Sequence, residues 1–462
     1  MPESLRPELR NPFPGLRPFR PDEDHLFFGR EEQVYSMITI LGKRRFLAVV
    51  GTSGSGKSSL VNCGLEPALH QGLLASAGSH WRIARFRPED RPIQNLDRAL
   101  ASDDVLFSDF QDRGLSLLEL IESTLRLSTV GLLDIVAQAS RNETFRLLVV
   151  VDQFEELFRY RQLVAVAGQG GTSFSEEATA FVSLLLAVLE ARQEQIHIVL
   201  TMRSDFLGDC TQFPGLAEAI NRSLYLVPRL TREERRAAIT NPVLVAGATI
   251  SPVLVTRLVN DVGDNPDQLS ILQHALNRTW AHWQDLGSSG PLDLSHYEAI
   301  GTMAEALDRH AEAAYAELGE GSRLQTVCRD LFQAITDRAS DGRGIRRPTK
   351  WGPLQAITRA SEQELGQVIE VFRHPSRAFL MPPAGTVLDE ESVIDISHES
   401  LMRVWRRLKT WGDAEALAAQ IYRRLAETAE LHASGSAGTL REPELTLFRK
   451  WEEERQPNAA WA

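Results

Sequence analysis

One stretch, Gly51 to Ser58, constrains this chain more than any other, and it reads GTSGSGKS. It matches the phosphate-loop template, in which a Gly and any four residues precede Gly-Lys-Ser or Gly-Lys-Thr. The apolar run before it, Arg45 to Val50, is typical of a buried parallel strand, and Ser58 to Asn62 can begin a helix. Glycines let backbone N–H groups converge on phosphate oxygens, and the helix N-terminus adds unpaired donors. The sequence therefore predicts a nucleotide phosphate site.

Residue types within this stretch assign individual roles. Lys57 is expected to reach the β- and γ-phosphates, and the Ser58 hydroxyl is expected to ligate Mg²⁺. A Gly/Ser-rich loop that matches by chance is the alternative, and the strand and helix patterns on either side argue against it. The residues predicted to surround the phosphates are Gly51, Thr52, Ser53, Gly54, Ser55, Gly56, Lys57, Ser58 and Ser59.

A second apolar run supplies the other half of such a site. Residues 145–151 (FRLLVVV) form the most strongly apolar run of the chain and are followed by Asp152-Gln153-Phe154-Glu155-Glu156. Asp152 is expected to hold Mg²⁺, directly or through water. Glu155 or Glu156 is expected to orient or deprotonate the attacking water, and the pattern does not decide between them. An acidic helix N-terminus is the weaker alternative.

The strand and helix patterns predict the fold of the first half. Further strands are expected at residues 81–87, 197–202 and 224–227, and helical patterns lie between them. Five strands that alternate with helices indicate an α/β P-loop NTPase domain with a five-stranded, largely parallel sheet. The strand at 197–202 brings Thr201, Arg203 and Asp205 to its carboxyl end, where ligands bind in open α/β sheets.

The hydrophobic period changes after Thr231, which pairs with Glu234 in a capping-box pattern and opens a helix that Pro242 is expected to follow. An all-α helical domain and then a winged-helix domain are predicted, the latter from a basic turn (342–352) and a hairpin-like ending before residue 398. The expected organisation is an N-terminal arm lying on the surface (1–25), the NTPase domain (26–227), the helical domain (228–290), the winged-helix domain (291–410) and a helical tail (411–462).

Composition excludes several classes of protein. The formal net charge of −12, from 50 basic and 62 acidic residues, argues against an overall nucleic-acid footprint. The three cysteines match no metal-binding spacing, so buried thiols in a reducing compartment are expected. The N-terminus has no apolar signal core, and no apolar run approaches the roughly 18 residues of a membrane span. These features predict a cytoplasmic protein.

Six ordered segments resemble a STAND ATPase, a class of nucleotide switches related to AAA+ ATPases that includes NACHT and NB-ARC proteins. The similarity is greatest to the bacterial novel STAND type that often precedes WD40 repeats, and it covers roughly residues 12–460. It implies ATP/ADP and Mg²⁺ as cofactors. The segments are FFGRE, GTSGSGKSS, LLVVVDQFEELF, VLTMRSDF, GDNPDQLSILQHAL and ISHESLMRVW.

The resemblance also implies roles for single residues. Arg203 corresponds to the sensor arginine near the γ-phosphate, and Pro266 to the proline that packs on the base. His398 takes the place of the histidine that senses the ADP β-phosphate. The short motif that packs on adenine and ribose corresponds to Phe28, Gly29 and Arg30.

Two departures from the related patterns stand out. AAA+ proteins usually place Glu directly after the metal-binding Asp, but this chain has Gln153, which argues against rapid hydrolysis. The spacing of Glu155 and Glu156 after Asp152 is similar to the NACHT form. Ser397 and Glu399 flank His398 where the better-known motif has Met and Asp.

The resemblance implies a conformational switch that binds Mg-ATP, hydrolyses it slowly to ADP and phosphate, and oligomerises or signals on activation. The expected partners are an adenine nucleotide and, in the ATP state, further copies of the chain. A protein partner or C-terminal sensor repeats are also expected, since the chain ends abruptly at NAAWA. A small-molecule kinase and a GTPase are less favoured, the latter because no Asn-Lys-x-Asp string occurs.

The alternative hypothesis is a winged-helix DNA-binding ATPase that regulates transcription. Two basic clusters could contact phosphates: Arg343, Arg346, Arg347 and Lys350, then Arg403, Arg406, Arg407 and Lys409.

Overall fold

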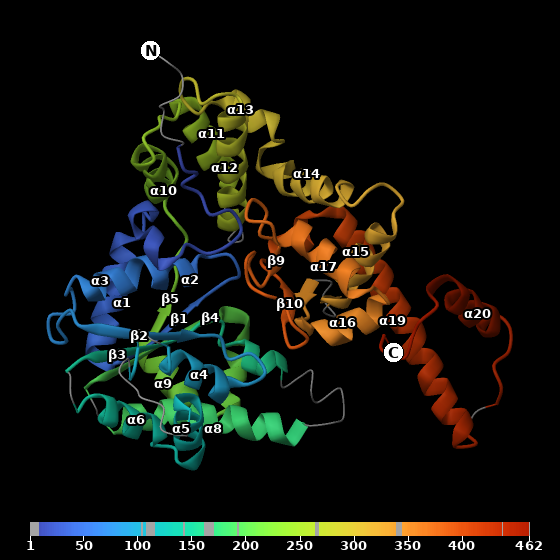
Figure 1. Ribbon diagram of the computed structural model, residues 1–462, viewed down its shortest axis with the longest axis horizontal. Coiled ribbons are helices and arrows are strands. Elements are labelled where there is room, and N and C mark those ends of the chain that lie inside the picture. Colours follow the sequence, from blue (N-terminus) through green and yellow to red (C-terminus); the bar gives the residue numbers. More distant parts are fainter. Residues whose placement is uncertain are drawn as a thin grey trace. The chain divides into compact units, whose positions relative to one another are not determined.

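The computed structural model describes residues 9–102, 105–107, 116–141, 144–160, 171–191, 194–263, 268–338, 344–436 and 438–461. They divide into two compact units. Figure 1 colours the chain along its sequence and labels its helices and strands. The phosphate-loop unit is built on Pro18–Gly247. The C-terminal unit is built on residues 9–17, Ala248–Gly263 and the chain from residue 268 onward.

The phosphate-loop unit contains a five-stranded sheet in which every neighbouring pair is parallel, in the order β2-β3-β4-β1-β5. This confirms the predicted largely parallel sheet. Strand β1 is apolar throughout and β3 is apolar after Arg146, because helices cover both faces of the sheet and leave almost no position facing water. The strands are β1 (Phe46–Gly51), β2 (Trp81–Phe86), β3 (Arg146–Val151), β4 (Ile196–Arg203) and β5 (Leu224–Leu226).

Two hydrophobic cores lie against the sheet, one on each face. One core contains side chains of α1, α2, η3 and α3 with the residues of β1, β3 and β4 that point to that face. The other contains side chains of α4, α5, α6, α8 and α9. The helices of this unit are η2 (Pro21–Leu26), α1 (Glu31–Arg44), α2 (Lys57–Leu60), η3 (Val61–Leu65), α3 (Glu66–His70), α4 (Pro92–Leu100), α5 (Leu117–Leu127), α6 (Gly131–Ala139), α8 (Gly171–Glu190), η4 (Ser204–Phe206), η5 (Gly208–Gln212), α9 (Leu216–Ser223) and α10 (Arg232–Val245).

Helix α10 confirms one prediction and corrects another. Thr231 and Glu234 form the expected capping box, in which each side chain accepts a hydrogen bond from the other residue's backbone N–H. Pro242, however, lies inside the helix and does not follow it. A proline there removes one backbone hydrogen bond, and the burial of Pro242 beside Ile239 and Val243 offsets that loss.

The N-terminal arm is partly buried, so the prediction that it lies on the surface is wrong for Pro12, Phe13, Gly15 and Leu16. Phe13 and Leu16 are buried in the C-terminal unit, where the Phe13 ring lies edge-on to Trp280 at 6.4 Å. Asn277 Nδ2 donates a hydrogen bond to Phe13 O at 2.7 Å. A turn at Gly15, which has a φ of 77°, lies between these two apolar side chains.

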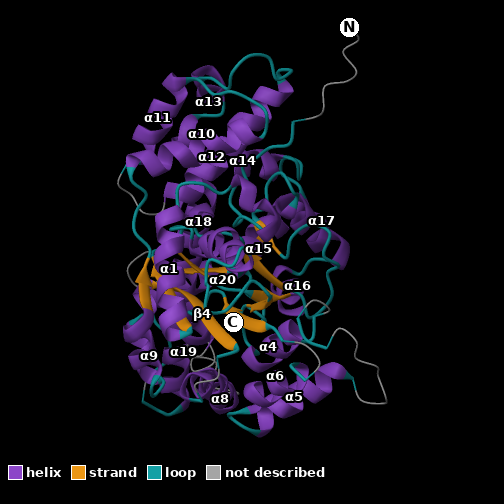
Figure 2. Cartoon of the chain, turned by 90° about the vertical axis from the view of Figure 1, so that its left-hand side faces the viewer, coloured by secondary structure: helices purple, strands orange, loops and turns teal. Residues whose placement is uncertain are grey.

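The C-terminal unit begins with helices and continues as a winged-helix domain, which confirms the predicted fold class. Figure 2 distinguishes its helices from its short strands. Its elements are α11 (Pro252–Val262), α12 (Gln268–Asp285), α13 (Leu294–Ala299), α14 (Thr302–Ala316), α15 (Arg323–Ala334), β6 (Thr336–Arg338), β7 (Gly344–Arg346), β8 (Thr349–Lys350), α16 (Trp351–Thr358), α17 (Glu362–Arg373), β9 (Leu380–Met381), β10 (Val393–Ile396), α18 (Ser400–Val404), α19 (Arg406–Ala433) and α20 (Glu444–Arg455).

Strand β10 pairs antiparallel with both β8 and β9, which forms the hairpin-like ending expected from the sequence. The aromatic side chains of Phe332, Phe372 and Trp405 meet in the core of this domain, with Trp405 5.1 Å from Phe332. No helix in the described part of the chain combines the length and the hydropathy that crossing a bilayer requires. Cys63, Cys210 and Cys328 are free and buried, as expected.

Candidate functional site

The phosphate loop connects β1 to α2 and depends on two glycines. Gly54 and Gly56 have φ angles of 74° and 85°, in the left-handed region that residues with a Cβ rarely adopt. Gly56 is also the N-cap of α2. Lys57 Nζ donates hydrogen bonds to Thr52 O at 2.8 Å and to Gly51 O at 3.1 Å. The ammonium group is therefore held against the loop on which phosphates are expected to bind.

The structure brings the two predicted metal ligands together. Ser58 Oγ donates a hydrogen bond to Asp152 Oδ1 at 2.7 Å. Thr201 Oγ1, at the end of β4, donates to the same oxygen at 2.6 Å. A hydroxyl and a buried carboxylate side by side are hard oxygen ligands of the kind that Mg²⁺ prefers. The residues present therefore fit a magnesium ion that is bound together with nucleotide phosphates.

The residue after Asp152 makes a local turn. Gln153 has a φ of 58°, and its backbone N–H donates to Thr201 Oγ1 at 3.0 Å. Phe154 then enters the core. Thr201 thus holds both the predicted metal-binding carboxylate and the turn that follows it, a role that the sequence did not reveal.

The two glutamates that the sequence could not separate have different neighbours. Glu155 Oε2 accepts a hydrogen bond from the backbone N–H of Arg203 at 3.3 Å. Glu156 Oε2 accepts one from the backbone N–H of Glu89, in the loop after β2, also at 3.3 Å. Both carboxylates are buried. Glu155 therefore faces the strand that carries the predicted sensor, and Glu156 faces the loop after the edge strand.

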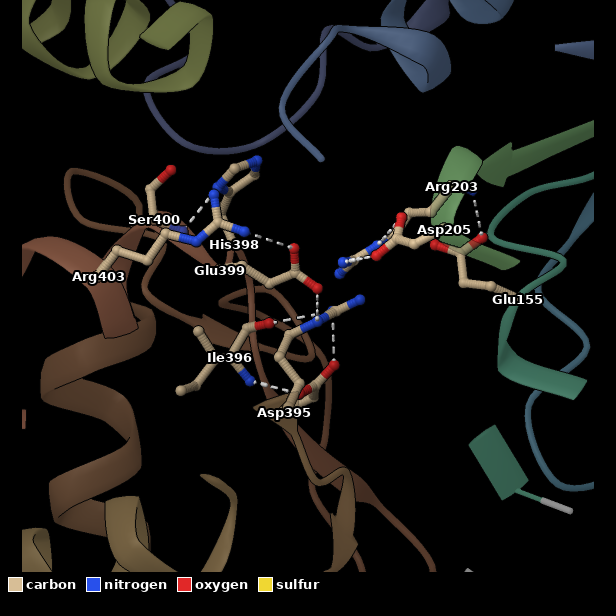
Figure 3. A network of polar contacts seen from close by, with 10 residues as sticks. Glu155, Arg203, Asp205, Asp395, Ile396, His398, Glu399, Ser400 and Arg403 are labelled. Carbon is tan, nitrogen blue, oxygen red and sulfur yellow. Dashed lines mark hydrogen bonds and ion pairs between the residues drawn. The ribbon is translucent and has the colours of Figure 1, made fainter. Parts of the chain in front are cut away.

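Arg203 ends β4 and is engaged by an acid of its own segment. Its Nε donates to Asp205 Oδ1 at 3.2 Å, and the two side chains form an ion pair, as Figure 3 shows together with the contact to Glu155. The guanidinium also lies 5.7 Å from the centre of the Phe206 ring. Its place at the carboxyl edge of the sheet is the predicted one, and its charge is balanced by Asp205.

The segment before α1 contacts the phosphate loop directly. Arg30 Nη2 donates to Ser55 O at 3.2 Å, and its Nη1 donates to Pro228 O at 2.8 Å. Burial lowers the pKa of Arg30, an effect that the nearby Glu234 opposes. A Cβ on Gly29 would lie 2.5 Å from Glu234 O, so only glycine permits this close approach. Phe28 is half-buried beside them.

Ser59 contacts the N-terminal segment of the same unit. Its Oγ accepts a hydrogen bond from Phe19 N at 3.1 Å, and Asn62 Nδ2 donates to Phe19 O at 2.9 Å. These contacts lie on α2 and on the π-helical turn η3 that follows it. The sequence placed Ser59 among the phosphate-surrounding residues and missed Phe19.

Two of the predicted nucleotide contacts are not among the described residues of the phosphate-loop unit. Pro266 is outside the described residues. His398 belongs to the C-terminal unit, where its Nδ1 accepts a hydrogen bond from Ser400 N at 3.1 Å (Figure 3). The next residue, Glu399, is buried, with ion pairs to Arg346 at 3.9 Å and to Arg403 at 3.8 Å.

The basic clusters offered for nucleic-acid binding are largely paired with acids. Arg346 is buried, and its Nη1 contacts Asp395 Oδ2 at 2.7 Å, while Lys350 Nζ contacts Glu391 at 2.7 Å. In the second cluster, Arg407 pairs with Glu312 at 2.8 Å and Arg406 with Asp308 at 3.6 Å. Arg343 is outside the described residues. This pairing leaves the DNA-binding alternative without support.

Arg87 is a further residue that the sequence did not single out. It follows β2 directly, and its Nε lies 3.8 Å from Asp152 Oδ2. The signal was available in part, because a basic residue directly after a parallel strand lies at the edge where ligands bind.

Comparison with solved structures finds distant likenesses. They include the ORC2 protein of Aeropyrum pernix in its ADPNP-ADP complexes, with 11% identity and a TM-score of 0.44 over 84% of this chain and 94% of that chain. The ORC1 protein of Aeropyrum pernix in complex with DNA has 13% identity and a TM-score of 0.41 over 86% and 94%. Cdc6p from Pyrobaculum aerophilum has 13% identity and a TM-score of 0.34 over 84% and 94%. Likenesses this distant carry no inference about ligands.

Comparison by sequence is more decisive. No curated protein matches the chain. The family model described as Novel STAND NTPase 1 matches residues 12–437, which include the phosphate loop, the acidic motif after β3 and His398. The chain therefore belongs to the novel STAND NTPase 1 family, as its six sequence segments indicated.

Proposed function

We propose that this protein is an ATP/ADP-dependent conformational switch that binds Mg-ATP, hydrolyses it slowly and changes its assembly or signals when activated. One observation carries the proposal: the hydroxyl of Ser58 and the carboxylate of Asp152 meet beside the phosphate loop, while the next position holds Gln153. Two groups expected to bind the metal therefore lie side by side, and the position after Asp152 lacks a carboxylate that could accept a proton.

The residues divide the work of nucleotide binding. Ser58 and Asp152 would hold Mg²⁺, which when bound offsets the charge of the β- and γ-phosphates. Lys57 exchanges its loop carbonyls for phosphate oxygens, and the N–H groups of the loop orient the phosphates. Arg30 supports the loop through Ser55 O, so its proposed contribution to adenine and ribose binding includes holding the loop's shape.

Slow hydrolysis is expected from the residues that follow Asp152. The Gln153 amide has no basic group with which to deprotonate water. Glu155 has one oxygen near Arg203 N, and we assign it to orienting the attacking water beside the predicted γ-phosphate sensor. That sensor, Arg203, has to exchange its partner Asp205 for the γ-phosphate, so ATP and ADP leave different charges at the end of β4.

A switch needs unequal binding of the two nucleotides by its two states. Moving an equilibrium from 1:99 to 99:1 takes about 5.5 kcal/mol of differential affinity. We assign Arg203 to the ATP state and His398 to the ADP state, where it would read the β-phosphate. Pro266 keeps its proposed place on the base. Self-association in the ATP state, a cytoplasmic location and a separate sensor or partner complete the proposal.

Nucleotide content and size in solution test the switch. The purified protein is expected to retain an adenine nucleotide, and exchange of ADP for Mg-ATP is expected to change its sedimentation coefficient. Lys57→Ala is expected to lose both the nucleotide and the response. A wild-type protein that holds no nucleotide, and whose shape and assembly ATP leaves unchanged, would show that the proposal is wrong.

Stability gives a second readout of the same binding. Nucleotide at about 100 times its Kd stabilises the folded state by about 2.7 kcal/mol if it does not bind the unfolded chain. Wild type is expected to show this gain in thermal unfolding, and Lys57→Ala is expected to show none.

A further inference from the structure

The two oxygens of the Asp152 carboxylate have different neighbours. Oδ1 accepts the hydroxyl hydrogens of Ser58 and Thr201. Oδ2 faces Arg87, whose Nε lies 3.8 Å away. The Asp152 side chain is 12% exposed and the Arg87 side chain 29% exposed, so solvent screens their attraction only in part. The metal carboxylate therefore already has a cation beside it, from the edge strand of the sheet.

The loop that carries Arg87 is held on two sides. Asn95 Nδ2, on α4, donates to Arg87 O at 3.2 Å and to Pro88 O at 3.0 Å. On the other side, Glu89 N donates to Glu156 Oε2 at 3.3 Å, and Glu89 has a φ of 48°. A loop that only joined β2 to α4 would not need an acid from the metal-binding motif to fix it.

We propose that Arg87 is a resident counter-cation of Asp152, which competes with Mg²⁺ and thereby sets the magnesium concentration at which the chain binds Mg-nucleotide. A guanidinium keeps its charge at any physiological pH, so the competition is permanent. Two cations drawn to one largely buried carboxylate repel each other, and the metal binds only when it outcompetes or displaces the arginine. This inference rests on the proposed function, since it takes Mg-nucleotide as the ligand.

The same geometry separates the two glutamates. Glu156 acts as a positioning residue, because its carboxylate holds the loop from which Arg87 reaches Asp152. Glu155 has no such contact with that loop and keeps its assignment to the water. A change at Glu156 is therefore expected to affect magnesium dependence in the same direction as a change at Arg87, and less strongly.

The test measures binding, with a fluorescent ADP analogue as probe and Mg²⁺ as the variable. Arg87→Gln removes the charge and is expected to lower the Mg²⁺ concentration at half-maximal binding by about threefold or more, the size of a partly exposed ion-pair interaction. Binding of the probe in excess EDTA is expected to stay the same. An unchanged or higher Mg²⁺ midpoint in Arg87→Gln would overturn the proposal.

Arg91→Gln is the matched control, since Arg91 is exposed on the same loop and its Nη1 contacts Gln94 at 3.4 Å. It removes the same charge and is expected to leave the midpoint unchanged; an equal shift in both variants would mean that only overall charge matters and would also overturn the proposal. Glu156→Ala is expected to lower the midpoint, and Glu156→Gln, whose amide oxygen still accepts from Glu89 N, to restore it.

Thermal unfolding of each variant shows whether it folds. If Arg87→Gln unfolds early, Arg87→Lys is measured in its place. This variant keeps the charge and is expected to keep the wild-type Mg²⁺ midpoint. A lowered midpoint in Arg87→Lys would contradict a role for charge. Failure of the two proposals looks different: if wild type binds the probe neither with Mg²⁺ nor in EDTA, the nucleotide switch itself is wrong.

Discussion

Arg346 and Arg87 each face an aspartate, and the two pairs differ in closeness and exposure. Arg346 Nη1 lies 2.7 Å from Asp395 Oδ2, and the two side chains are 7% and 11% exposed. Arg87 Nε lies 3.8 Å from Asp152 Oδ2, and 29% of the Arg87 side chain is exposed. Arg346 also donates to Ile396 O, so it has backbone and carboxylate partners together.

The difference teaches how burial separates structure from function. A close, buried pair cannot exchange partners without leaving a charge uncompensated, so it fixes one conformation of the segment before His398. A longer and partly exposed pair loses little when one partner leaves. The pair at Asp152 can therefore yield to a metal ion, while the pair at Asp395 holds the chain in place.

The largest expected effect comes from breaking the buried pair. Arg346→Ala leaves Asp395 and Glu399 buried without this cation and is expected to lower the unfolding free energy by about 3–5 kcal/mol. Urea unfolding followed by tryptophan fluorescence measures this, since Trp81 is the only tryptophan of the phosphate-loop unit and the signal mainly reports the C-terminal unit. Arg87→Ala, the matched variant, is expected to cost less than about 1 kcal/mol. Equal losses would contradict the comparison.

The second prediction compares the two oxygens of Asp152, since Oδ1 accepts a hydrogen bond from Thr201 and Oδ2 faces Arg87. Thr201→Val removes the hydroxyl that donates to Asp152 Oδ1, in a buried contact, and accepts from Gln153 N, in a partly buried one. Its cost is expected to lie toward the upper end of about 1–3 kcal/mol, because two polar groups lose a partner. Chemical denaturation of the phosphate-loop unit, followed by circular dichroism, measures it. A cost as small as that of Arg87→Ala would mean that both oxygens of Asp152 are held equally loosely.

Low pH tests burial at two uncharged side chains of the C-terminal unit, His274 and His310. Burial lowers the pKa of His310 to about 2 and that of His274 to about 3, and their rings lie 5.2 Å apart. Each folded-state pKa is below the ordinary value of 6.5, so protons favour the unfolded chain and stability falls as the pH drops below 6.5.

The measurement compares unfolding free energies at pH 7 and pH 5. Protonation of His310 in the unfolded state alone is expected to cost the wild type about 2 kcal/mol over this range. His310→Gln cannot take up that proton, and its stability is expected to fall by correspondingly less. The same pH dependence in both proteins would exclude His310 as a cause.

The smallest expected effect is at an exposed pair of the winged-helix domain. Lys350 Nζ contacts Glu391 at 2.7 Å, as close as the Arg346 pair, but the Glu391 side chain is 72% exposed. Lys350→Ala is expected to cost less than about 1 kcal/mol, because water screens the pair. Differential scanning calorimetry beside Arg346→Ala tests whether burial or distance sets the cost. A loss close to that of Arg346→Ala would favour distance.

Much of the fold was predictable because its signals are local. The apolar runs of β1 and β3 predicted buried parallel strands, and the capping box at Thr231 predicted the start of α10. The length of α10 was not predictable, since the packing of Pro242 in the core outweighs its helix-breaking tendency. The buried arm was missed for the same reason: a short proline-rich segment shows no period that reveals which unit covers it.

The candidate site also contains residues that the sequence predicted and residues that it did not. Ser58 and Asp152 were predicted to meet because parallel strands bring their carboxyl ends to one edge. Arg87, Thr201 and Phe19 were not assigned roles, since no motif marks them and only packing brings each to its partner. The sequence left Glu155 and Glu156 equivalent, and only their different partners separate them.

By itself, the sequence determined that this protein has a phosphate loop, an apolar strand followed by an acid, and the ordered segments of its family. These depend on residue types at short spacing, where backbone geometry leaves few alternatives. Only the tertiary structure decided which charges are buried and which are open to exchange. The sequence predicts a basic turn at Arg346, yet this residue lies on β7 and is buried against its partner Asp395, 49 residues away. The strength of a charge pair depends on how far water screens it, and only the packing of the folded chain determines how much water reaches the pair.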